Sequence, residues 1–256
     1  MISFITRPLR LIALIALVGV GVGGYLAWSG AHSSTATDQN SALADYRARG
    51  VTDTTPIPGA PAPGVYRYRA TGNESAGSGV ISAERPLPAQ AVYIISPIAG
   101  GYHEDLRLSE EHIEEARYAV SDTAVTALWR RTKITFLGIG TDDRTDVTPP
   151  SVDHPTRFTV GRTWGGAYAL GETGVTYRGT VVSKGTATLD GATIPVVVLR
   201  TESTFTGPTP GTRTDLIQWS PDLSLPVTWA ITQKTGGSSE FAIDAKLTLE
   251  SGTPAR

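Results

Sequence analysis

Alternation of apolar and polar residues in steps of two constrains the fold of this chain more than any other feature. From Phe241 to Leu249, apolar side chains occupy every second position, and mostly polar side chains stand between them. Successive side chains of a β-strand point to opposite faces, so this period predicts a strand with one buried and one wet face. The same pattern recurs around Tyr66, Tyr177 and Trp229. The chain therefore predicts a mainly β, antiparallel domain.

Turn signals divide this domain into strands. Asp190-Gly191 lies between two apolar segments and predicts a β-hairpin, because a type I′ turn requires positive φ at both central residues. Together with later Gly-rich and Pro-rich turns, it predicts a meander of about six antiparallel strands from Thr173 onward. Residues 108–120 leave two interpretations open, a short amphipathic helix that begins at Ser109 or a hairpin of two strands. The extended pattern of the flanking segments favours the hairpin.

A sheet with one apolar face must cover that face, and the sequence predicts little helix to do so. We therefore expect residues 64–256 to form a curved antiparallel sheet, as a half-barrel or an open barrel. Either the sheet curls on itself into a closed or half-closed barrel filled by side chains, or it leaves a cavity for an apolar ligand. In the second case, the residues expected to line the cavity are Tyr66, Tyr177, Trp229 and Phe241.

The N-terminal segment predicts a membrane anchor. Residues 11–28 carry no charge and would span roughly 27 Å as a helix, which just crosses a bilayer core. Because Arg7 and Arg10 precede this run, residues 1–10 are predicted to be cytoplasmic and the C-terminal domain to lie outside the cytoplasm. The alternative is a signal peptide cleaved before His32. The length of the apolar run favours the uncleaved, single-pass anchor in the cell membrane.

A different composition follows the anchor. Residues 29–63 are rich in Ser, Thr, Ala, Asp and Pro, and the prolines of residues 54–63 exclude a helix or a central strand there. We interpret residues 29–63 as a flexible stalk. A short helix over residues 41–49, ended by Gly50, would be marginal in isolation.

No pattern in the sequence indicates catalysis or a cofactor. The chain has no cysteine, which excludes disulfides and thiolate chemistry, and its net charge of −2 argues against nucleic acid as a partner. No GxSxG motif is present. The nearest approach to a metal site is His103 beside Glu104 and Asp105, with His112 further on, and we interpret these as solvated side chains at strand ends. We therefore expect no enzyme, no metal and no cofactor.

Several segments carry a resemblance to a known family. They are GVYRYRATGNES at residues 64–75, the hairpin around Asp190-Gly191, and QWSPDLSLPVTW at residues 218–229. The chain resembles uncharacterised single-anchor envelope proteins of high-GC Gram-positive bacteria. These are in turn similar to the β half-barrels of lipoprotein carriers and lipid-transport lipoproteins. The resemblance covers roughly residues 64–256 and implies an architecture rather than an activity.

These observations favour a non-enzymatic, membrane-anchored protein outside the cytoplasm that binds a lipid or another apolar ligand in a β half-barrel. The alternative is a structural or signalling ectodomain that binds another envelope protein through a sheet edge or loops. A cavity continuous with solvent would favour the first function, whereas a filled core with an exposed apolar patch would favour the second.

Overall fold

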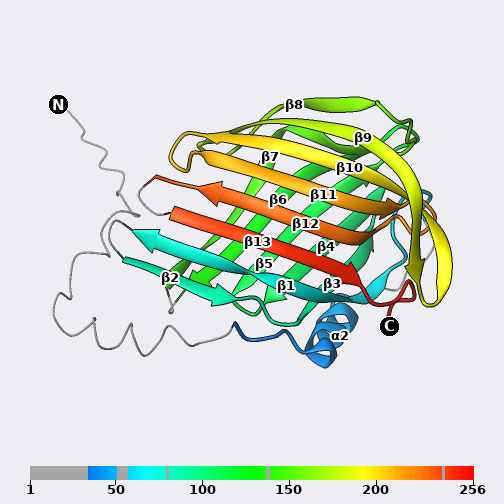
Figure 1. The fold of residues 1–256 in the computed structure, drawn as a ribbon, viewed down its shortest axis with the longest axis horizontal. Coiled ribbons are helices and arrows are strands. Elements are labelled where there is room, and N and C mark those ends of the chain that lie inside the picture. The colour runs from blue at the N-terminus through cyan, green and yellow to red at the C-terminus, as the bar shows by residue number, and fades with distance from the viewer. Residues whose placement is uncertain (1–33, 51–56, 79–80, 137–138, 238–239) are drawn as a thin grey trace, which may run out of the picture. The chain divides into compact units, whose positions relative to one another are not determined.

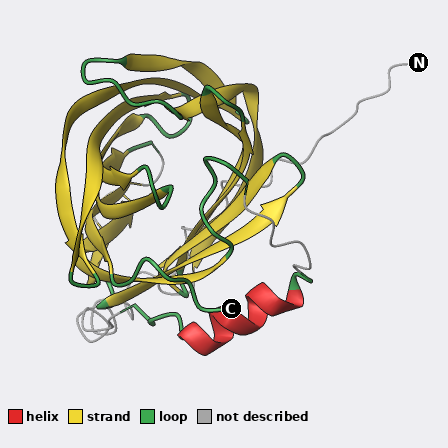
Figure 2. Cartoon of the chain, turned by 90° about the vertical axis from the view of Figure 1, so that its right-hand side faces the viewer, coloured by secondary structure: helices red, strands yellow, loops and turns green. Residues whose placement is uncertain are grey.

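The strands of this protein close into an antiparallel β-barrel (Figures 1 and 2). The computed structural model describes residues 34–50, 57–78, 81–136, 139–237 and 240–256. The first half of the sheet comprises β1 (Gly64–Ser78), β2 (Ile81–Pro86), β3 (Gln90–Ile98), β4 (Gly101–Ser109), β5 (His112–Val120), β6 (Ala124–Phe136) and β7 (Ile139–Pro155). The second half comprises β8 (Thr163–Leu170), β9 (Thr173–Leu189), β10 (Ala192–Thr206), β11 (Gly211–Ser220), β12 (Leu225–Thr235) and β13 (Glu240–Leu249).

Strand β1 closes the ring. It pairs with β13 along one edge, from Tyr68 opposite Leu249 to Gly77 opposite Glu240. Its other edge pairs first with β3 and then with β2, so these two strands share one position and the ring has twelve. The prediction of a half-barrel or an open barrel was therefore wrong. Closure pairs the backbone groups that the edges of an open sheet would leave free.

The sequence signals of the second half are confirmed, with one correction. Asp190 and Gly191 have φ values of 52° and 76°, as the type I′ turn between β9 and β10 requires. In β13, Ile243, Ala245 and Leu247 are buried, as the period of two predicted. The meander after Thr173 has five strands, β9 to β13, rather than about six, because β9 and β10 are long strands.

Residues 108–120 form the predicted hairpin rather than a helix. Strands β4 and β5 pair from Gly101 opposite Ala119 to Ser109 opposite His112, with a turn at residues 110–111. Ser109 ends the strand, and its hydroxyl accepts hydrogen bonds from the backbone N–H groups of Glu111 and His112. Ser109 therefore stabilises a turn instead of beginning a helix.

Apolar side chains fill part of the barrel interior. The largest buried cluster packs inward from β1, β3 to β7, β12 and β13. It extends to Leu189 at the tip of the β9–β10 hairpin. Next to this tip, the Asp190 carboxylate accepts hydrogen bonds from Ser251 Oγ at 3.1 Å and from the Gly252 N–H at 3.0 Å. The hairpin tip is thus tied to the C-terminal segment, and this end of the barrel is packed with side chains.

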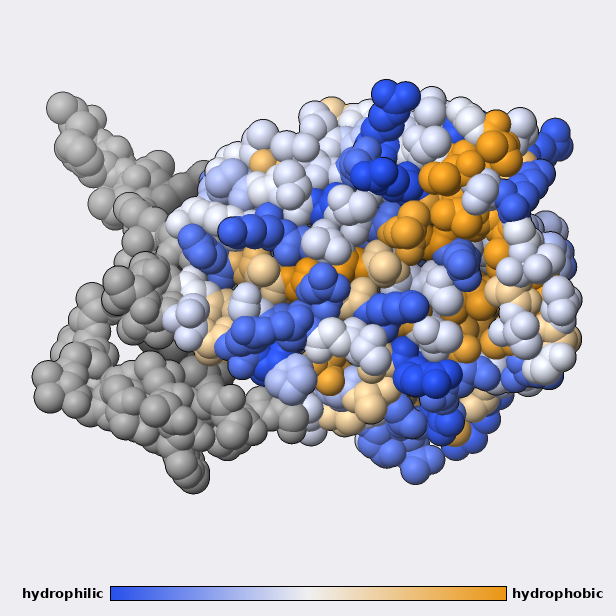
Figure 3. Space-filling view, viewed as in Figure 1, coloured by the Kyte–Doolittle hydropathy of each residue, from blue (hydrophilic) through white to orange (hydrophobic). Residues whose placement is uncertain are grey.

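The outer face of the barrel is mixed in polarity. Hydrophilic side chains are spread over the face shown in Figure 3, with apolar areas between them. Among the described residues, the exposed large apolar side chains are Val160, Val182 and Leu216. Most large apolar side chains of the strands therefore point inward.

Helix α2 (Gln39–Ala48) lies on the outside of the barrel (Figure 1). Asp38 caps it by accepting a hydrogen bond from the Ser41 N–H at 3.1 Å. Ala42 and Tyr46 are buried against an outer apolar cluster of Val65, Val92 and Ile94. This packing stabilises a helix that would be marginal alone.

The prediction of a flexible stalk over residues 29–63 therefore needs correction for residues 34–50. In addition to the packing of α2, the carbonyl of Thr35 accepts a hydrogen bond from the Glu110 N–H in the β4–β5 turn, at 3.0 Å. The predicted anchor at residues 11–28 lies outside the described residues. Within the described part of the chain, no helix has the length and apolar character that crossing a membrane requires.

Candidate functional site

The barrel encloses a cavity of about 640 Å³. Side chains from β3 to β13 line it, and the lining extends to the exposed residues Asp143, Glu172 and Thr209. These residues lie near the turns that join β6 to β7, β8 to β9 and β10 to β11, opposite the packed end. Pockets of roughly 300–1,000 Å³ are typical of small-molecule sites. The interior therefore has the size of a ligand-binding site, with its mouth at one end of the barrel.

Aromatic side chains form much of the cavity wall, including three of the four predicted lining residues. Tyr177, Trp229 and Phe241 line the cavity, as expected. Tyr66 does not, which corrects that prediction: it is 2% exposed and packs within the large apolar cluster. Its hydroxyl donates to the Ala62 carbonyl at 2.7 Å. The inward alternation of Tyr66 was correct, but its place near the start of β1 puts it in the filled part of the barrel.

Other tryptophans differ in their roles. Trp164 and Trp219 also line the cavity, and the Trp164 indole N–H donates to the Asp153 carbonyl at 2.7 Å. Trp129 lies away from the cavity, where the Arg144 guanidinium stacks 4.4 Å from its ring centroid. Only the interior tryptophans can report on a molecule bound in the cavity.

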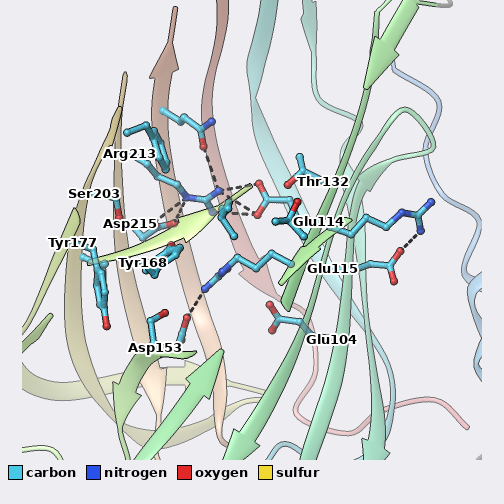
Figure 4. A pocket seen from close by; sticks show the side chains of 18 of the residues that line it. Glu104, Glu114, Glu115, Thr132, Asp153, Tyr168, Tyr177, Ser203, Arg213 and Asp215 are labelled. Atoms are coloured by element: carbon cyan, nitrogen blue, oxygen red, sulfur yellow. Dashed lines mark hydrogen bonds and ion pairs between the residues drawn. The ribbon is translucent and has the colours of Figure 1, made fainter. Parts of the chain in front are cut away.

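A charged cluster crosses the interior between β5 and β11 (Figure 4). Arg213 donates through Nη1 and Nη2 to Glu114 at 3.0–3.2 Å and through Nε to Asp215 at 3.0–3.1 Å. The Trp229 indole N–H also donates to Asp215, at 2.9 Å. Burial alone would raise the pKa of Glu114, but the charges of Arg213 and His112 hold this pKa well below its usual range. Glu114 is therefore ionised at neutral pH.

This cluster continues to β1 and β2 through His112. The Nδ1 atom of His112 lies 2.7 Å from Glu74 Oε2, and Arg85 pairs with Glu74 at 2.6 Å. Burial alone would lower the pKa of His112, but its contacts with Glu114 and Glu74 outweigh burial and raise the pKa to about 9. At neutral pH, protonated His112 therefore lies between buried Glu74, at 2.7 Å, and partly buried Glu114, at 3.6 Å.

A second cluster surrounds Glu104. Its carboxyl group accepts hydrogen bonds from the hydroxyls of Tyr93 and Tyr118, the latter at 2.9 Å. Burial raises the pKa of Glu104 to about 7, although the Tyr93 hydrogen bond opposes this shift. Glu104 thus exists in both protonation states near neutral pH.

Arg130 and Asp153 lie at the edge of this second cluster. Arg130 Nη2 donates to Asp153 Oδ1 at 2.9 Å, and His154 Nδ1 lies 3.0 Å from the other carboxylate oxygen. Burial would raise the pKa of Asp153, but His154 and Arg130 lower it to about 2. The Nε atom of Arg130 has no hydrogen-bond partner among the described residues. The Arg130–Asp153 pair therefore stays charged at neutral pH.

Of these charged residues, only Glu104 and His112 stood out in the sequence, and their interpretation as solvated side chains was wrong, because both are buried. Alternation assigns the others to the wet face of each strand. One signal was present in β4, where Tyr102, Glu104, Leu106 and Leu108 share a face by alternation. A carboxylate on an otherwise apolar face indicates a buried polar site. The clusters join strands far apart in the chain, which no local pattern reveals.

The histidines that suggested a metal site lie apart. His112 lines the cavity from β5, whereas the neighbours of Glu104 on β4, His103 and Asp105, point to the opposite face. There, Asp105 pairs with Arg49 at 2.5 Å. In the described ranges, no group of three or more potential ligand residues is placed to hold a metal ion.

The structure and the comparisons limit the family resemblance. The motifs that suggested it lie in strands β1, β10, β11 and β12, but the sheet that they build is closed. What the structure shares with the expectation is an antiparallel, barrel-like architecture. No family model, no curated protein and no solved structure matches this chain, so the resemblance to single-anchor envelope proteins has no support from known proteins.

Proposed function

We propose that this protein binds a small amphiphilic molecule inside its barrel and does not transform it. The observation that carries this proposal is the cavity of about 640 Å³ with aromatic and charged groups on its walls. Aromatic rings favour an apolar ligand body, at about 25 cal/mol per Å² of apolar surface buried. A few fixed polar groups then orient the ligand. Such a lining suits a molecule with both an apolar and a polar part.

The charges of the two buried clusters balance when Glu104 is protonated. The anions are Glu74, Glu114, Asp153 and Asp215, and the cations are Arg85, His112, Arg130 and Arg213. Four negative and four positive charges give no net charge. Ion pairs of this kind hold polar side chains in fixed positions, which supports a preformed cavity rather than a collapsed core.

The proposed location follows from the sequence. We propose that residues 11–28 anchor the protein in the cell membrane and that the barrel lies outside the cytoplasm. A barrel held near a bilayer would be close to a supply of lipids and other amphiphiles. This placement supports a lipid or lipid-like compound as the ligand.

The test changes the space in the cavity without changing its charges. Ser203 lines the cavity from β10, whereas its neighbour Thr204 is exposed on the outer face (Figure 4). We expect Ser203→Phe to occupy the lumen and reduce ligand binding, and Thr204→Phe on the same strand to leave binding unchanged. Native mass spectrometry of the full chain, incubated with a total lipid extract, measures the bound fraction.

The outcomes separate binding from its absence. Wild-type protein and Thr204→Phe should retain a bound molecule of defined mass, and Ser203→Phe should lose it. Binding in the cavity is contradicted if all three proteins show the unliganded mass alone. It is also contradicted if all three retain the bound molecule equally.

A further inference from the structure

We propose that the ligand carries a carboxylate head group and that Arg130 binds it. This inference rests on the proposed function, because it names the chemistry of a ligand held in the cavity. It starts from a comparison among the arginines of this protein. Their partners show what surroundings a partly buried guanidinium has in this barrel.

Three other arginines each pair with two acidic side chains. Arg213 pairs with Glu114 and Asp215, Arg131 with Glu115 and Asp142, and Arg107 with Asp105 and Asp45. A planar guanidinium with five N–H donors can bind two carboxylates at once. Two carboxylates for one arginine is therefore a recurring arrangement in this protein.

Arg130 departs from this arrangement, as does Arg85, which pairs with Glu74 alone but lies over the Phe136 ring at 4.0 Å. Among the described residues, Arg130 has one acidic partner, Asp153, which Nη2 contacts at 2.9 Å, and its Nε is unpartnered but closed off from solvent. Its side chain retains 32% of its exposed surface although it lines the cavity from the inner face of β6. With Nη2 on Asp153 and Nε closed off, Nη1 is the donor left for a second carboxylate, which a ligand in the cavity can supply.

The surroundings of Arg130 accept an additional negative charge. Asp153 is already paired with Arg130 at 2.9 Å, and His154 Nδ1 lies 3.0 Å from its other carboxylate oxygen. Glu104 is held by two tyrosine hydroxyls, and burial favours its neutral form. An anion bound to Arg130 thus meets no uncompensated carboxylate. It recreates at Arg130 the two-carboxylate geometry of Arg213.

The remaining cavity wall suits the apolar part of such a ligand. Trp164, Tyr168 and Tyr177 line the cavity from β8 and β9, and Trp219 and Trp229 line it from β11 and β12. The Tyr168 and Tyr177 rings pack edge to face with centroids 5.6 Å apart. An alkyl or aryl carboxylate can therefore place its acid group at Arg130 and its body against these rings.

Three probes with the same alkyl chain test the head group: dodecanoate, dodecanol and dodecylammonium. At about pH 6, the acid is ionised, the amine is protonated, and Glu104, whose pKa burial raises to about 7, is mainly protonated. Isothermal titration calorimetry of the full wild-type chain should give a dissociation constant about tenfold or more lower for dodecanoate than for dodecanol, the difference expected for a charge-assisted hydrogen bond. Dodecylammonium should bind no more tightly than dodecanol.

Each other result has a definite meaning. If dodecanol or dodecylammonium binds as tightly as dodecanoate, the carboxylate inference is wrong and the proposed amphiphile-binding function stands. If none of the three binds, the proposed function is itself contradicted, and the inference falls with it.

Two matched substitutions assign the effect to Arg130. Arg130→Gln should remove the advantage of dodecanoate over dodecanol while dodecanol binding persists. Arg200→Gln makes the same change on the outer surface, where Arg200 pairs with Glu202 at 2.6 Å, and should keep the advantage. Equal advantages in both variants would overturn the role of Arg130. If Arg130→Gln does not fold, as judged by circular dichroism, Arg130→Lys and the three-probe series on the wild-type chain still decide the question.

Discussion

Replacing Arg213 with methionine should destabilise the barrel strongly. The substitution keeps an unbranched side chain but removes the guanidinium that joins Glu114 on β5 to Asp215 on β11. These two carboxylates would then share the interior without the cation between them. We expect the free energy of unfolding to fall, because buried charges left without a partner are costly.

The structure sets the size of this effect. Arg213 makes two contacts to Asp215 at 3.0–3.1 Å and three to Glu114 at 3.0–3.2 Å. Removing one partner of a buried ion pair costs about 3–5 kcal/mol. The side chains of Arg213, Glu114 and Asp215 keep 17%, 18% and 12% of their exposure, so water in the cavity reduces the penalty. We therefore expect a loss of about 3 kcal/mol, which corresponds to a decrease in Tm of about 6–12 °C.

The loss should depend on pH in a defined direction. In the wild-type protein, a lowered pKa means that ionised Glu114 contributes stability at neutral pH, and this contribution is lost as the pH falls below about 4.5. Without Arg213, burial shifts the pKa of Glu114 upward, so protonation at mildly acidic pH relieves the penalty. The difference between variant and wild type should therefore shrink from about pH 7 to about pH 4.5.

Urea unfolding followed by tryptophan fluorescence measures this difference. Arg200→Met is the matched control, because Arg200 pairs with Glu202 at 2.6 Å on the surface, where the two side chains are 54% and 55% exposed. It should cost less than about 1 kcal/mol. The reasoning is refuted if both variants lose the same stability, or if the loss in Arg213→Met grows toward acidic pH.

Three further predictions concern the interior. His112→Gln should destabilise the protein most below about pH 6.5, and this effect should disappear as the pH rises through about 9. The stability that a raised pKa contributes is present only while the histidine is protonated. A difference in urea unfolding that does not depend on pH would contradict this. The wild-type protein should lose stability as the pH rises from about 4.5 through about 7, because burial favours the protonated form of Glu104. Glu104→Gln should remove this loss. Parallel profiles of stability against pH for the two proteins would refute the assignment. Gly179→Ala should lower the free energy of unfolding by about 1–3 kcal/mol and shift the tryptophan emission, because the added methyl group would overlap the Trp164 indole. Unchanged stability would show that this part of the barrel wall is not tightly packed.

The sequence predicted local strand structure well, for a physical reason. The period of two around Phe241 and the positive φ required at Asp190-Gly191 depend on neighbouring residues alone. Closure of the barrel depends instead on β1 meeting β13, and Tyr68 pairs with Leu249 across most of the chain. No local pattern specifies whether the two ends of a curved sheet meet. The half-barrel prediction failed at that step.

The site was harder to predict than the fold. Alternation correctly placed Tyr177, Trp229 and Phe241 inside, and the cavity happens to include their part of the barrel. The charged residues were missed because each cluster is completed across strands, as in the contact of Glu114 with Arg213, 99 residues apart. A buried carboxylate is stabilised only by partners that the folded barrel supplies. Judged from the sequence alone, its polarity predicts an outward position, so its inward position could not be predicted.

Closure also bears on the alternative function of binding an envelope partner through a sheet edge. Along β1, both edges are occupied, by β13 on one side and by β3 and β2 on the other. The edges that an open half-barrel would offer there are therefore not free. Elsewhere among the described residues, β2 pairs with β1 alone and β7 pairs with β8 at two positions only, so these strands still present unpaired edges.

The position of a bound amphiphile tests the central claim most directly. We would crystallise the full chain with bromine-labelled dodecanoate and locate the bromine by anomalous diffraction. The account predicts a bromine peak inside the barrel, among the aromatic residues of the cavity, with the carboxylate density at Arg130. A bromine peak on the outer face, near Val182 and Leu216, with an empty interior would contradict it.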